Sequence, residues 1–575
     1  MKSFSSFFSV GLLVLFLLAM RLPAAAQAPV WQSARAVATA TAAATNTYST
    51  VSATAVDAAG NVLLAGAFIN TVVLGSTTLT SLGGYDVFVA KFNPTTNQFV
   101  WAQGAGGTGD ELAYALAVSG PNVYVAGSFT GATAVFGAAT LANSGNTGSS
   151  DVFVAKLTDA GTTSGFAWAQ QAGGIGGNDQ ARALAVSGTS VYVAGSFTGP
   201  AMGLGSITLT NTSAGFADAF VAKLTDTGST SSFAWAQQAG GPGFDGAAAL
   251  AVSGTKVYMA GFTSSTASFG ATTLVSVGAY DVFVAKLADA GSTSSFAWVQ
   301  RAGGPGDEFA YALAVSGPSV YVAGSFAGST AGFGAATLTN SDNAGSSDVF
   351  VAKLTDAGST GSFAWARGAG GGANDQARAL AASGTSVYVA GSFNSPTANF
   401  GATTLTAAGA NGTSDVFVAK IADAGNTGDF AWAHRAGGIY DDGATALAVS
   451  GTSIHVVGGV RSPTAGFGAL TFSNPNTTYL GFLATLTDPT LTATAPSRAL
   501  AQAAQLFPNP AHGTATLRLP AGTAPAPLTL ADALGRSVRR YPAPTGPEAT
   551  LDLHGLPAGL YLLRGAGSAQ RLAVE

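Results

Sequence analysis

Residues 151–157 read DVFVAKL, and this short string decides the fold because the chain uses it repeatedly. It returns unchanged at 281–287 and 348–354, with near copies at 86–92, 218–224 and 415–421. The string is rich in Val and Phe and lies among turn-forming residues, which is typical of a β-strand. Its sixth position holds six of the eight lysines of the chain: Lys91, Lys156, Lys223, Lys286, Lys353 and Lys420.

These lysines are predicted to be structural. Strand alternation places the Lys on an apolar face together with Val152 and Val154, and a buried ammonium group without a partner would cost several kcal/mol. We therefore expect most of these lysines to reach a carboxylate or backbone carbonyls. The expected carboxylate is the recurring turn Asp of an adjacent strand or blade.

The tryptophans define the length of the repeat. They lie 70, 67, 67, 63, 67 and 67 residues apart, and each unit holds four strand-like runs such as FAWAQQAGG, ARALAVSG, SVYVAGSF and DVFVAKL. Several runs are apolar at nearly every position, which indicates that both faces of each sheet are covered. Four antiparallel strands per unit predict an all-β fold, a seven-bladed β-propeller of four-stranded blades over residues 29–489. The seven tryptophans are Trp31, Trp101, Trp168, Trp235, Trp298, Trp365 and Trp432.

The two ends of the repeat array complement each other. The array begins with a lone Trp strand, VWQSARAV at 30–37, and ends with YLGFLATLTD at 479–488, which has no Trp strand after it. Pairing of these two segments would close the ring and leave no open sheet edge.

The hairpin DAAGNVLLAG at 57–66, with later forms such as SGTSVYVAG, resembles the SBBP-type β-propeller repeat. The resemblance covers about residues 30–489 and implies a propeller fold without identifying a ligand. A second pattern is a duplicated block of three units, 101–297 onto 298–488. Identity between units can therefore reflect copying.

Composition excludes several classes of protein. Charged residues make up 9% of the chain, apolar residues 47%, and the net charge is −5, so a highly charged disordered chain is excluded. The chain has no basic run of the kind that nucleic-acid binding needs, so no nucleic-acid partner is expected. The absence of cysteine excludes disulfides, thiolate metal sites and a Cys nucleophile.

Residues 1–28 are predicted to be a signal peptide. They combine Lys2, an apolar run and small residues at Ala26 and Ala28 before Pro29. Arg21 after the apolar run leaves an uncleaved anchor as the alternative. No later run reaches the length of a transmembrane helix, so we expect no transmembrane segment after cleavage of the signal.

The last part of the chain differs in composition. A linker at 490–505 precedes short strands with Pro and Gly turns, which predict a small Ig-like β-sandwich at 506–575. LFPNPAHGTATLRLP, DALGRSVRR and LPAGLYLLRG in this segment resemble the C-terminal sorting domain of the type IX secretion system. The resemblance implies that residues 506–575 contact the secretion machinery and that the chain is released or attached to the outer surface.

One acidic residue recurs after a Gly-Gly pair in each unit. We interpret it as a structural turn carboxylate that accepts backbone N–H groups, and a carboxylate ring that binds a cation or sugar is the alternative. No HExxH, G-x-S-x-G or EF-hand pattern is present, so no catalytic residue, metal site or cofactor is predicted, and calcium is an unsupported candidate. The turn carboxylates are Asp110, Asp179, Asp245, Asp307, Asp375 and Asp441.

The position just before each ALAVSG run varies between units. It holds Tyr114, Arg182, Ala248, Tyr311, Arg378 and Thr445 in turn. If this run is the innermost strand, Tyr114, Arg182, Tyr311 and Arg378 lie near the channel mouth and could bind a ligand. Ordinary packing at the rim is the alternative.

These observations predict an exported, non-enzymatic β-propeller that binds glycan or protein at the cell surface or outside the cell. The alternative is a secreted carbohydrate-active hydrolase or lyase that uses carboxylates on the loop face.

Overall fold

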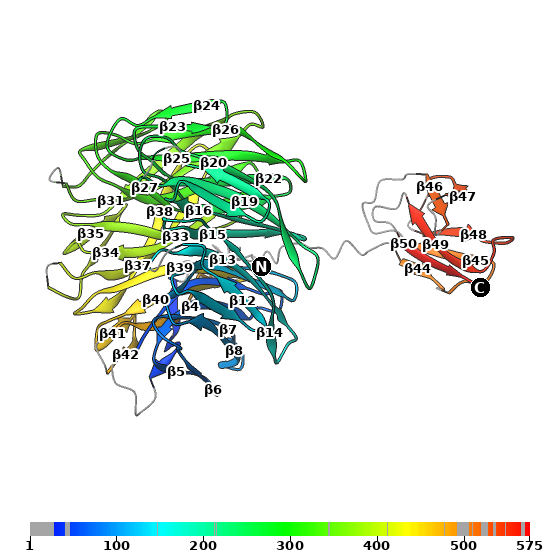
Figure 1. Cartoon of the computed structure of the whole chain (residues 1–575), viewed down its shortest axis with the longest axis horizontal. Helices are drawn as coiled ribbons and strands as arrows, with labels where there is room; N and C mark the ends of the chain where they lie inside the picture. Colours follow the sequence, from blue (N-terminus) through cyan, green and yellow to red (C-terminus); the bar gives the residue numbers. More distant parts are fainter. Residues whose placement is uncertain are drawn as a thin grey trace, which may run out of the picture. The chain divides into compact units, whose positions relative to one another are not determined.

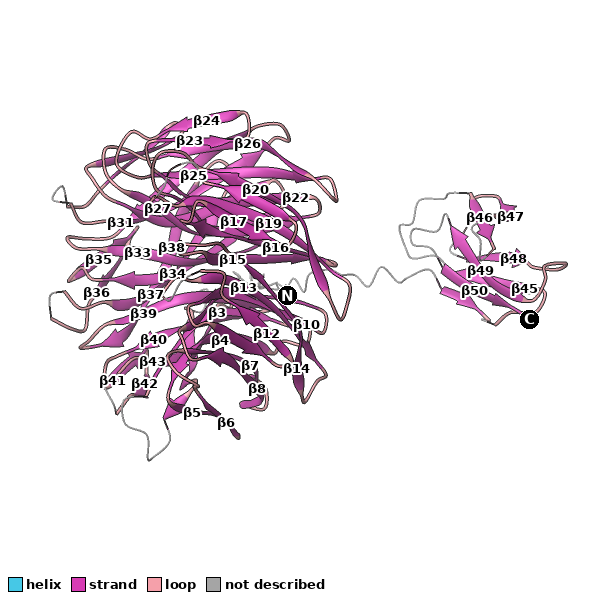
Figure 2. Cartoon of the chain, in the orientation of Figure 1, coloured by secondary structure: helices cyan, strands magenta, loops and turns pink. Residues whose placement is uncertain are grey.

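The structure, a computed structural model, describes residues 28–40 and 47–491 apart from the loop positions 146–147, 212, 214, 343–344, 411 and 476–477. It also describes residues 505–575 apart from 509, 519–526, 533–535, 545, 547 and 565–569. The chain divides into two compact units, Met1–Leu491 and Thr492–Glu575. All regular elements of the described residues are β-strands (Figure 1, Figure 2), so the all-β prediction is confirmed. The predicted signal peptide and linker lie almost entirely outside these residues, and the domain boundaries stay predictions.

The first unit repeats one antiparallel pattern of four strands in its described part. Five of these sheets have four strands, and two are extended to six strands by a short hairpin. The innermost strands are β3 (Tyr48–Val56), β9 (Glu111–Ser119), β15 (Gln180–Ser187), β21 (Asp245–Ser253), β27 (Glu308–Ser316), β33 (Asp375–Ser383) and β39 (Asp442–Ser450). The second strands are β4 (Val62–Ile69), β10 (Asn122–Phe129), β16 (Ser190–Phe197), β22 (Lys256–Thr263), β28 (Ser319–Phe326), β34 (Ser386–Phe393) and β40 (Ser453–Val460). The third strands, which carry the DVFVAKL string, are β7 (Asp86–Asn93), β13 (Asp151–Asp159), β19 (Asp218–Asp226), β25 (Asp281–Asp289), β31 (Asp348–Asp356), β37 (Asp415–Asp423) and β43 (Leu480–Thr487). The outer strands are β8 (Gln98–Gly107), β14 (Ser164–Ala172), β20 (Ser231–Ala239), β26 (Ser294–Ala302), β32 (Gly361–Ala369), β38 (Gly428–Gly438) and β1 (Val30–Ala36).

A short hairpin lies between the second and third strands of each sheet in the sequence. The hairpins are β5 (Thr71–Leu74) with β6 (Thr77–Thr80), β11 (Thr133–Phe136) with β12 (Ala139–Ala142), β17 (Ala201–Leu204) with β18 (Ile207–Thr210), β23 (Thr266–Phe269) with β24 (Thr272–Val275), β29 (Thr330–Phe333) with β30 (Ala336–Thr339), β35 (Thr397–Phe400) with β36 (Thr403–Thr406), and β41 (Thr464–Phe467) with β42 (Leu470–Ser473). The two-residue strand β2 (Thr39–Ala40) pairs with β5.

The third strand of each sheet is buried on both faces. In β13 the first seven residues are buried, and alternate side chains pack against different neighbouring sheets. Phe153 and Leu157 share a core with Val89 of β7, whereas Val152 and Val154 pack with Val193 of β16. The continuous apolar run follows from this packing, because a strand between two covered faces has no solvent side.

The ends of the first unit meet. β1 pairs antiparallel with β43, from Val30 opposite Thr487 to Ala36 opposite Phe482, and completes the sheet β1-β43-β40-β39. β3 lies beside β39 and β40, which are labelled in Figure 2. Each sheet nevertheless is an open layer with edge strands, so the expectation that pairing leaves no open edge is wrong.

The buried lysines link neighbouring sheets. Lys156 Nζ lies 2.7 Å from Asp226 Oδ2 and 2.9 Å from the Gly228 carbonyl oxygen. The Tyr124 hydroxyl and the Trp168 indole N–H donate to the same carboxylate at 2.7 and 3.0 Å. Burial acts to raise the pKa of Asp226, but hydrogen bonds from Lys156 and Tyr124 hold it below its ordinary value. We call this Lys-to-Asp contact with its Tyr and Trp donors the inter-sheet link.

All six lysines pair with an Asp carboxylate, but this Asp is not the expected partner. The Tyr donor is missing at Asp159, where Leu63 takes its place, and the Trp432 indole N–H does not reach Asp488. The acceptor is the Asp that ends the third strand of the next sheet, or that follows β43 in the last one, and no turn Asp of the predicted set takes part. The structural reason is that the terminal Asp of each DVFVAKLTD segment lies where the Lys side chain of the preceding sheet ends. The other pairs are Lys91–Asp159, Lys223–Asp289, Lys286–Asp356, Lys353–Asp423 and Lys420–Asp488.

The second unit contains two antiparallel sheets. Their orders are β44-β45-β48 and β47-β46-β49-β50, and they share a core that includes Leu517, Leu530, Leu551, Leu563 and Leu572. Their strands are β44 (Gln505–Phe507), β45 (Thr514–Arg518), β46 (Leu528–Ala531), β47 (Ser537–Tyr541), β48 (Glu548–Asp552), β49 (Gly559–Arg564) and β50 (Gln570–Val574). The part of the chain that the structure describes includes no helix long and apolar enough to span a membrane.

We expect Asp356→Ala to lower the free energy of unfolding of the full chain by about 3–5 kcal/mol, because it leaves the Lys286 ammonium group buried without its carboxylate. Urea unfolding followed by tryptophan fluorescence measures the loss. Asp429→Ala is the matched control, since Asp429 forms an exposed pair with Arg367 and should cost less than about 1 kcal/mol. Equal losses in the two variants would contradict a stabilising role of the inter-sheet link.

Candidate functional site

Each innermost strand contains one β-bulge near its start. In β9 the register passes from Ala115 to Ala113 opposite Ala126 and Gly127, so that Tyr114 has no partner across the sheet. A bulge residue is free to turn its side chain away from the pleat. The same irregularity occurs in all seven sheets, at Ser52, Tyr114, Arg182, Ala248, Tyr311, Arg378 and Thr445.

A glycine opposite each bulge explains why it forms. A Cβ placed on Gly127 would lie 1.8 Å from the Leu112 carbonyl oxygen and 2.8 Å from the Phe153 ring. The equivalent Gly324 would meet the Phe309 carbonyl oxygen at the same 1.8 Å. The glycine in the repeated VYVAG string is therefore needed for the close approach of the bulged strand.

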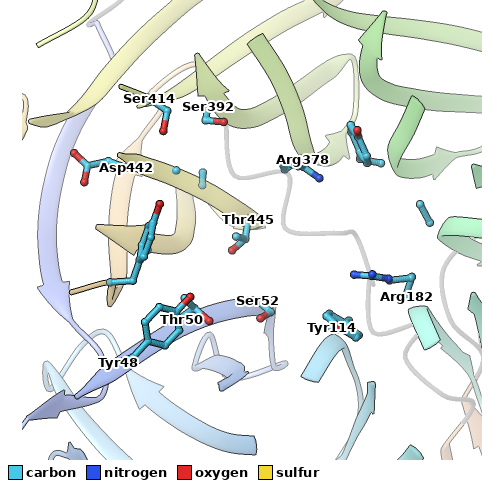
Figure 3. A pocket seen from close by; sticks show the side chains of 16 residues that line it. Tyr48, Thr50, Ser52, Tyr114, Arg182, Arg378, Ser392, Ser414, Asp442 and Thr445 are labelled. Atoms are coloured by element: carbon cyan, nitrogen blue, oxygen red, sulfur yellow. The ribbon is translucent and has the colours of Figure 1, made fainter. Parts of the chain in front are cut away.

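The seven bulge positions line one cavity. The cavity has a volume of about 470 Å³, and its other walls include Tyr48, Thr50, Asp442 and Tyr479. Tyr114, Arg182, Tyr311 and Arg378, the predicted ligand-binding residues, come together here although they lie up to 264 residues apart. Figure 3 shows Arg182 and Arg378 at one side of the opening, with Ser52 and Thr445 facing it. We call this cavity the mouth. Ala and Leu side chains of the same innermost strands line a second cavity, which shares residues with the mouth.

The two arginines at the mouth are held in the same way. The Arg182 guanidinium lies 4.3 Å from the centroid of the Tyr114 ring, and the Arg378 guanidinium lies 4.2 Å from that of Tyr311. Each also donates a hydrogen bond to a Gln two residues earlier in its own strand. Stacking on an aromatic ring orients a guanidinium while its N–H groups stay available to a ligand.

One carboxylate reaches the mouth among the described lining residues. Asp442 is fully buried and accepts four hydrogen bonds, from Ser462 Oγ and from the backbone N–H groups of Gly438, Arg461 and Ser462. Its oxygens are thus occupied by the fold. A hydrolase or lyase of the predicted alternative type uses a pair of carboxylates, and the mouth supplies one.

The predicted turn carboxylates do not occupy one equivalent position. Asp179, Asp245 and Asp375 are buried at the start of the innermost strands, and the equivalent residues elsewhere are Glu111, Glu308 and Asp442. Each accepts the backbone N–H of a glycine four or five residues earlier, for example Gly371 to Asp375 at 2.8 Å. Asp110, Asp307 and Asp441 stand one position earlier, on the more exposed turn. The sequence interpretation combined two positions because it counted from the Gly-Gly pair.

Each buried carboxylate faces a second one, the Asp that begins the third strand of the preceding sheet. Asp281 Oδ1 and Glu308 Oε2 lie 2.3 and 2.4 Å from the position that a Cβ on Gly303 would take. Burial, together with Asp281, raises the pKa of Glu308 to about 8. Burial likewise raises the pKa of Glu111, Asp179 and Asp245 to about 7. A proton held between two such carboxyl groups reduces the cost of burying two like charges.

The described residues contain no cluster of three or more Asp, Glu or His side chains with the geometry of a metal site. Calcium binding thus has no observation in its favour. The absence of a cofactor remains a prediction.

Some large apolar side chains are exposed on the turns before the innermost strands and on the loops before the third strands. They are Leu82, Ile175, Phe216, Phe244, Val277, Ile439 and Tyr440. Ser414 and Tyr479, at the ends of two such loops, line the mouth itself.

The C-terminal unit can be assigned to a class. Residues 505–573 match the secretion system C-terminal sorting domain, so the predicted type IX sorting domain is confirmed. The chain is therefore an exported protein, directed to the outer surface or the extracellular space.

No curated protein matches the chain. Three solved structures show a distant likeness. They are a putative 6-phosphogluconolactonase from Bacteroides uniformis (12% identity, 73% of this chain and 94% of that one, TM-score 0.36), a protein of unknown function from Dyadobacter fermentans (10%, 80% and 99%, 0.33), and a Trypanosoma rangeli sialidase in complex with sialic acid (10%, 80% and 79%, 0.33). Likenesses at these scores carry no argument about what the chain binds or does.

The buried carboxyl groups predict an unusual pH dependence. A group whose pKa is raised on folding binds protons more tightly in the folded state, so its effect destabilises the protein as pH rises toward 7 or 8. The pKa values of Asp226 and Asp289 are lowered on folding. These two groups therefore stabilise the protein above about pH 4, and this stabilisation is lost as the pH falls further. We expect the thermal midpoint of the full chain to be highest near pH 5 and to fall by several degrees toward pH 8.

Calorimetry at constant ionic strength measures this profile. Glu308→Gln should make the fall between pH 5 and pH 8 smaller, and Thr337→Ala, on the exposed hairpin β29–β30, should leave it unchanged. A thermal midpoint that stays constant or rises between pH 5 and pH 8 would contradict the raised pKa values of the buried carboxyl groups.

Proposed function

We propose that residues 29–489 form a closed seven-bladed propeller which, after export, binds a glycan or protein ligand at the mouth without catalysing a reaction. The observation that carries this proposal is the convergence of seven bulge residues, two stacked Tyr–Arg pairs among them, on one cavity. Its volume of about 470 Å³ is in the range of ligand sites.

A closed propeller would require β43, from the last sheet, to contact β7, from the first sheet. Side chains from both strands line a cavity of about 380 Å³, which includes Phe92, Asn97, His455 and Thr485. Hydrogen bonds from Ser49 N to the Tyr479 carbonyl and from Thr478 Oγ1 to the Thr47 carbonyl also cross between the ends of the array. By repeat position, Thr485 replaces the Lys of the inter-sheet link and Pro94 replaces its Asp. We call this junction, which lacks the Lys-to-Asp pair, the seam.

A double-mutant cycle tests the seam. Thr485→Lys should lower the urea midpoint, because it adds a half-buried ammonium group without a carboxylate partner. Pro94→Asp added to this variant should recover stability, with a coupling between the two changes of about 1–3 kcal/mol. Additive effects would show that these positions do not meet as they do in the other six junctions.

Ligand binding is tested first with arrays of polysaccharides and surface proteins, probed with the full-length chain. Tyr114→Ala/Tyr311→Ala should weaken any interaction found by about tenfold, because two aromatic faces are lost. Tyr541→Ala, in the C-terminal unit, is the control and should bind as the unchanged chain does. A chain that binds nothing at high micromolar concentration would overturn the proposal, and product release from a polysaccharide would favour the enzyme alternative.

A further inference from the structure

The distribution of paired charges identifies the kind of ligand. In the described part of the first unit, every lysine lies within 4.0 Å of a carboxylate oxygen, and Arg301, Arg367, Arg435 and Arg461 do so as well. The remaining described arginines are Arg35, Arg182 and Arg378. Arg35 bonds to Asn97 and covers the Phe92 ring at the seam. Three described arginines of the first unit thus lack a carboxylate partner, and two of them, Arg182 and Arg378, line the mouth.

The surroundings of these two arginines leave their charge available. Both side chains are exposed, and the hydrogen bonds that they make go to neutral Gln side chains. The one carboxylate of the described lining, Asp442, is already satisfied by four donors and lies across the opening from both arginines in Figure 3. A cavity with low-dielectric walls concentrates such a potential and favours an anion.

The other lining groups favour a sugar over an acidic peptide. Hydroxyl groups of Thr50, Ser52, Ser392, Ser414 and Thr445 surround the opening, and tyrosine rings stand among them. Hydroxyl groups pair well with the hydroxyl groups of sugars, and aromatic faces stack on sugar rings.

We infer that the mouth binds an acidic polysaccharide, with Arg182 and Arg378 each engaging a carboxylate or sulfate group. This inference rests on the proposed function, since it identifies the ligand of the same cavity. A guanidinium held on a ring presents paired N–H groups to the two oxygens of a carboxylate or sulfate. The hydroxyl groups then select a sugar that carries the anion.

The experiment uses the full-length chain and four defined polymers: polygalacturonate, dextran sulfate, dextran and polyglutamate. We expect binding to polygalacturonate or dextran sulfate that is at least about tenfold tighter than binding to dextran and that weakens with added salt. Preference between the two acidic polymers distinguishes a carboxylate from a sulfate as the anion. Arg182→Gln/Arg378→Gln should reduce the affinity by about tenfold or more.

A matched variant controls for net charge. Arg367→Gln/Lys256→Gln also removes two positive charges, but at half-exposed positions that do not line the mouth, and it should bind as the unchanged chain does. Equal loss in both variants would overturn the inference by showing a general charge effect. Equal binding of dextran, or tighter binding of polyglutamate, would overturn it while the mouth remained a binding site. Failure to bind any of these polymers, or any ligand on the arrays, would overturn the proposed function as well.

Discussion

The contact on which the first unit depends is the buried Lys-to-Asp pair between adjacent sheets. One copy of DVFVAKLTD supplies both halves of this contact: its Lys reaches forward to the next sheet, and its terminal Asp receives the Lys of the sheet before. A buried ammonium without its carboxylate would destabilise the fold, so neither position can change alone. This reciprocity explains why the string persists where other parts of the unit have diverged. It also explains how a block of three units could be duplicated, since each copy brings a donor and an acceptor.

The sequence predicts the features that recur with the period of the repeat. The Lys and Trp spacings predict the repeated strands, and the spare strand around Trp31 predicts pairing with the segment at 479–488, as β1 and β43 pair. The partner of each Lys could not be predicted, because several acidic positions recur with the same period of about 67 residues. The buried carboxylates were partly misplaced for a related reason. Counted back from ALAVSG instead of forward from Gly-Gly, Glu111, Asp179 and Glu308 fall at one constant distance.

The bulges show a different limit of sequence reasoning. Variation at Tyr114 and its equivalents indicated a tolerant position, but the reason lies on the paired strand, where Gly127 admits the extra residue. The glycine that admits the extra residue is present in every VYVAG string, but its role can be interpreted only when the strand register is known. Because the bulge is fixed by the main chain and the glycine, the side chain at the bulge is free to differ between sheets. The mouth can therefore change its chemistry without cost to the packing of the repeat.

Duplication alone would account for the two Tyr–Arg pairs, since Tyr114 and Arg182 correspond to Tyr311 and Arg378 in the copied block. The third bulge of each block argues against simple inheritance, because Ala248 corresponds to Thr445. The third bulge position thus differs between the two blocks, whereas the first two positions hold Tyr and Arg, with their long side chains, in both blocks. Each retained guanidinium at the mouth stacks on a Tyr ring and bonds to a Gln, but neither has a carboxylate partner. Retention without such a partner is what a ligand contact would produce.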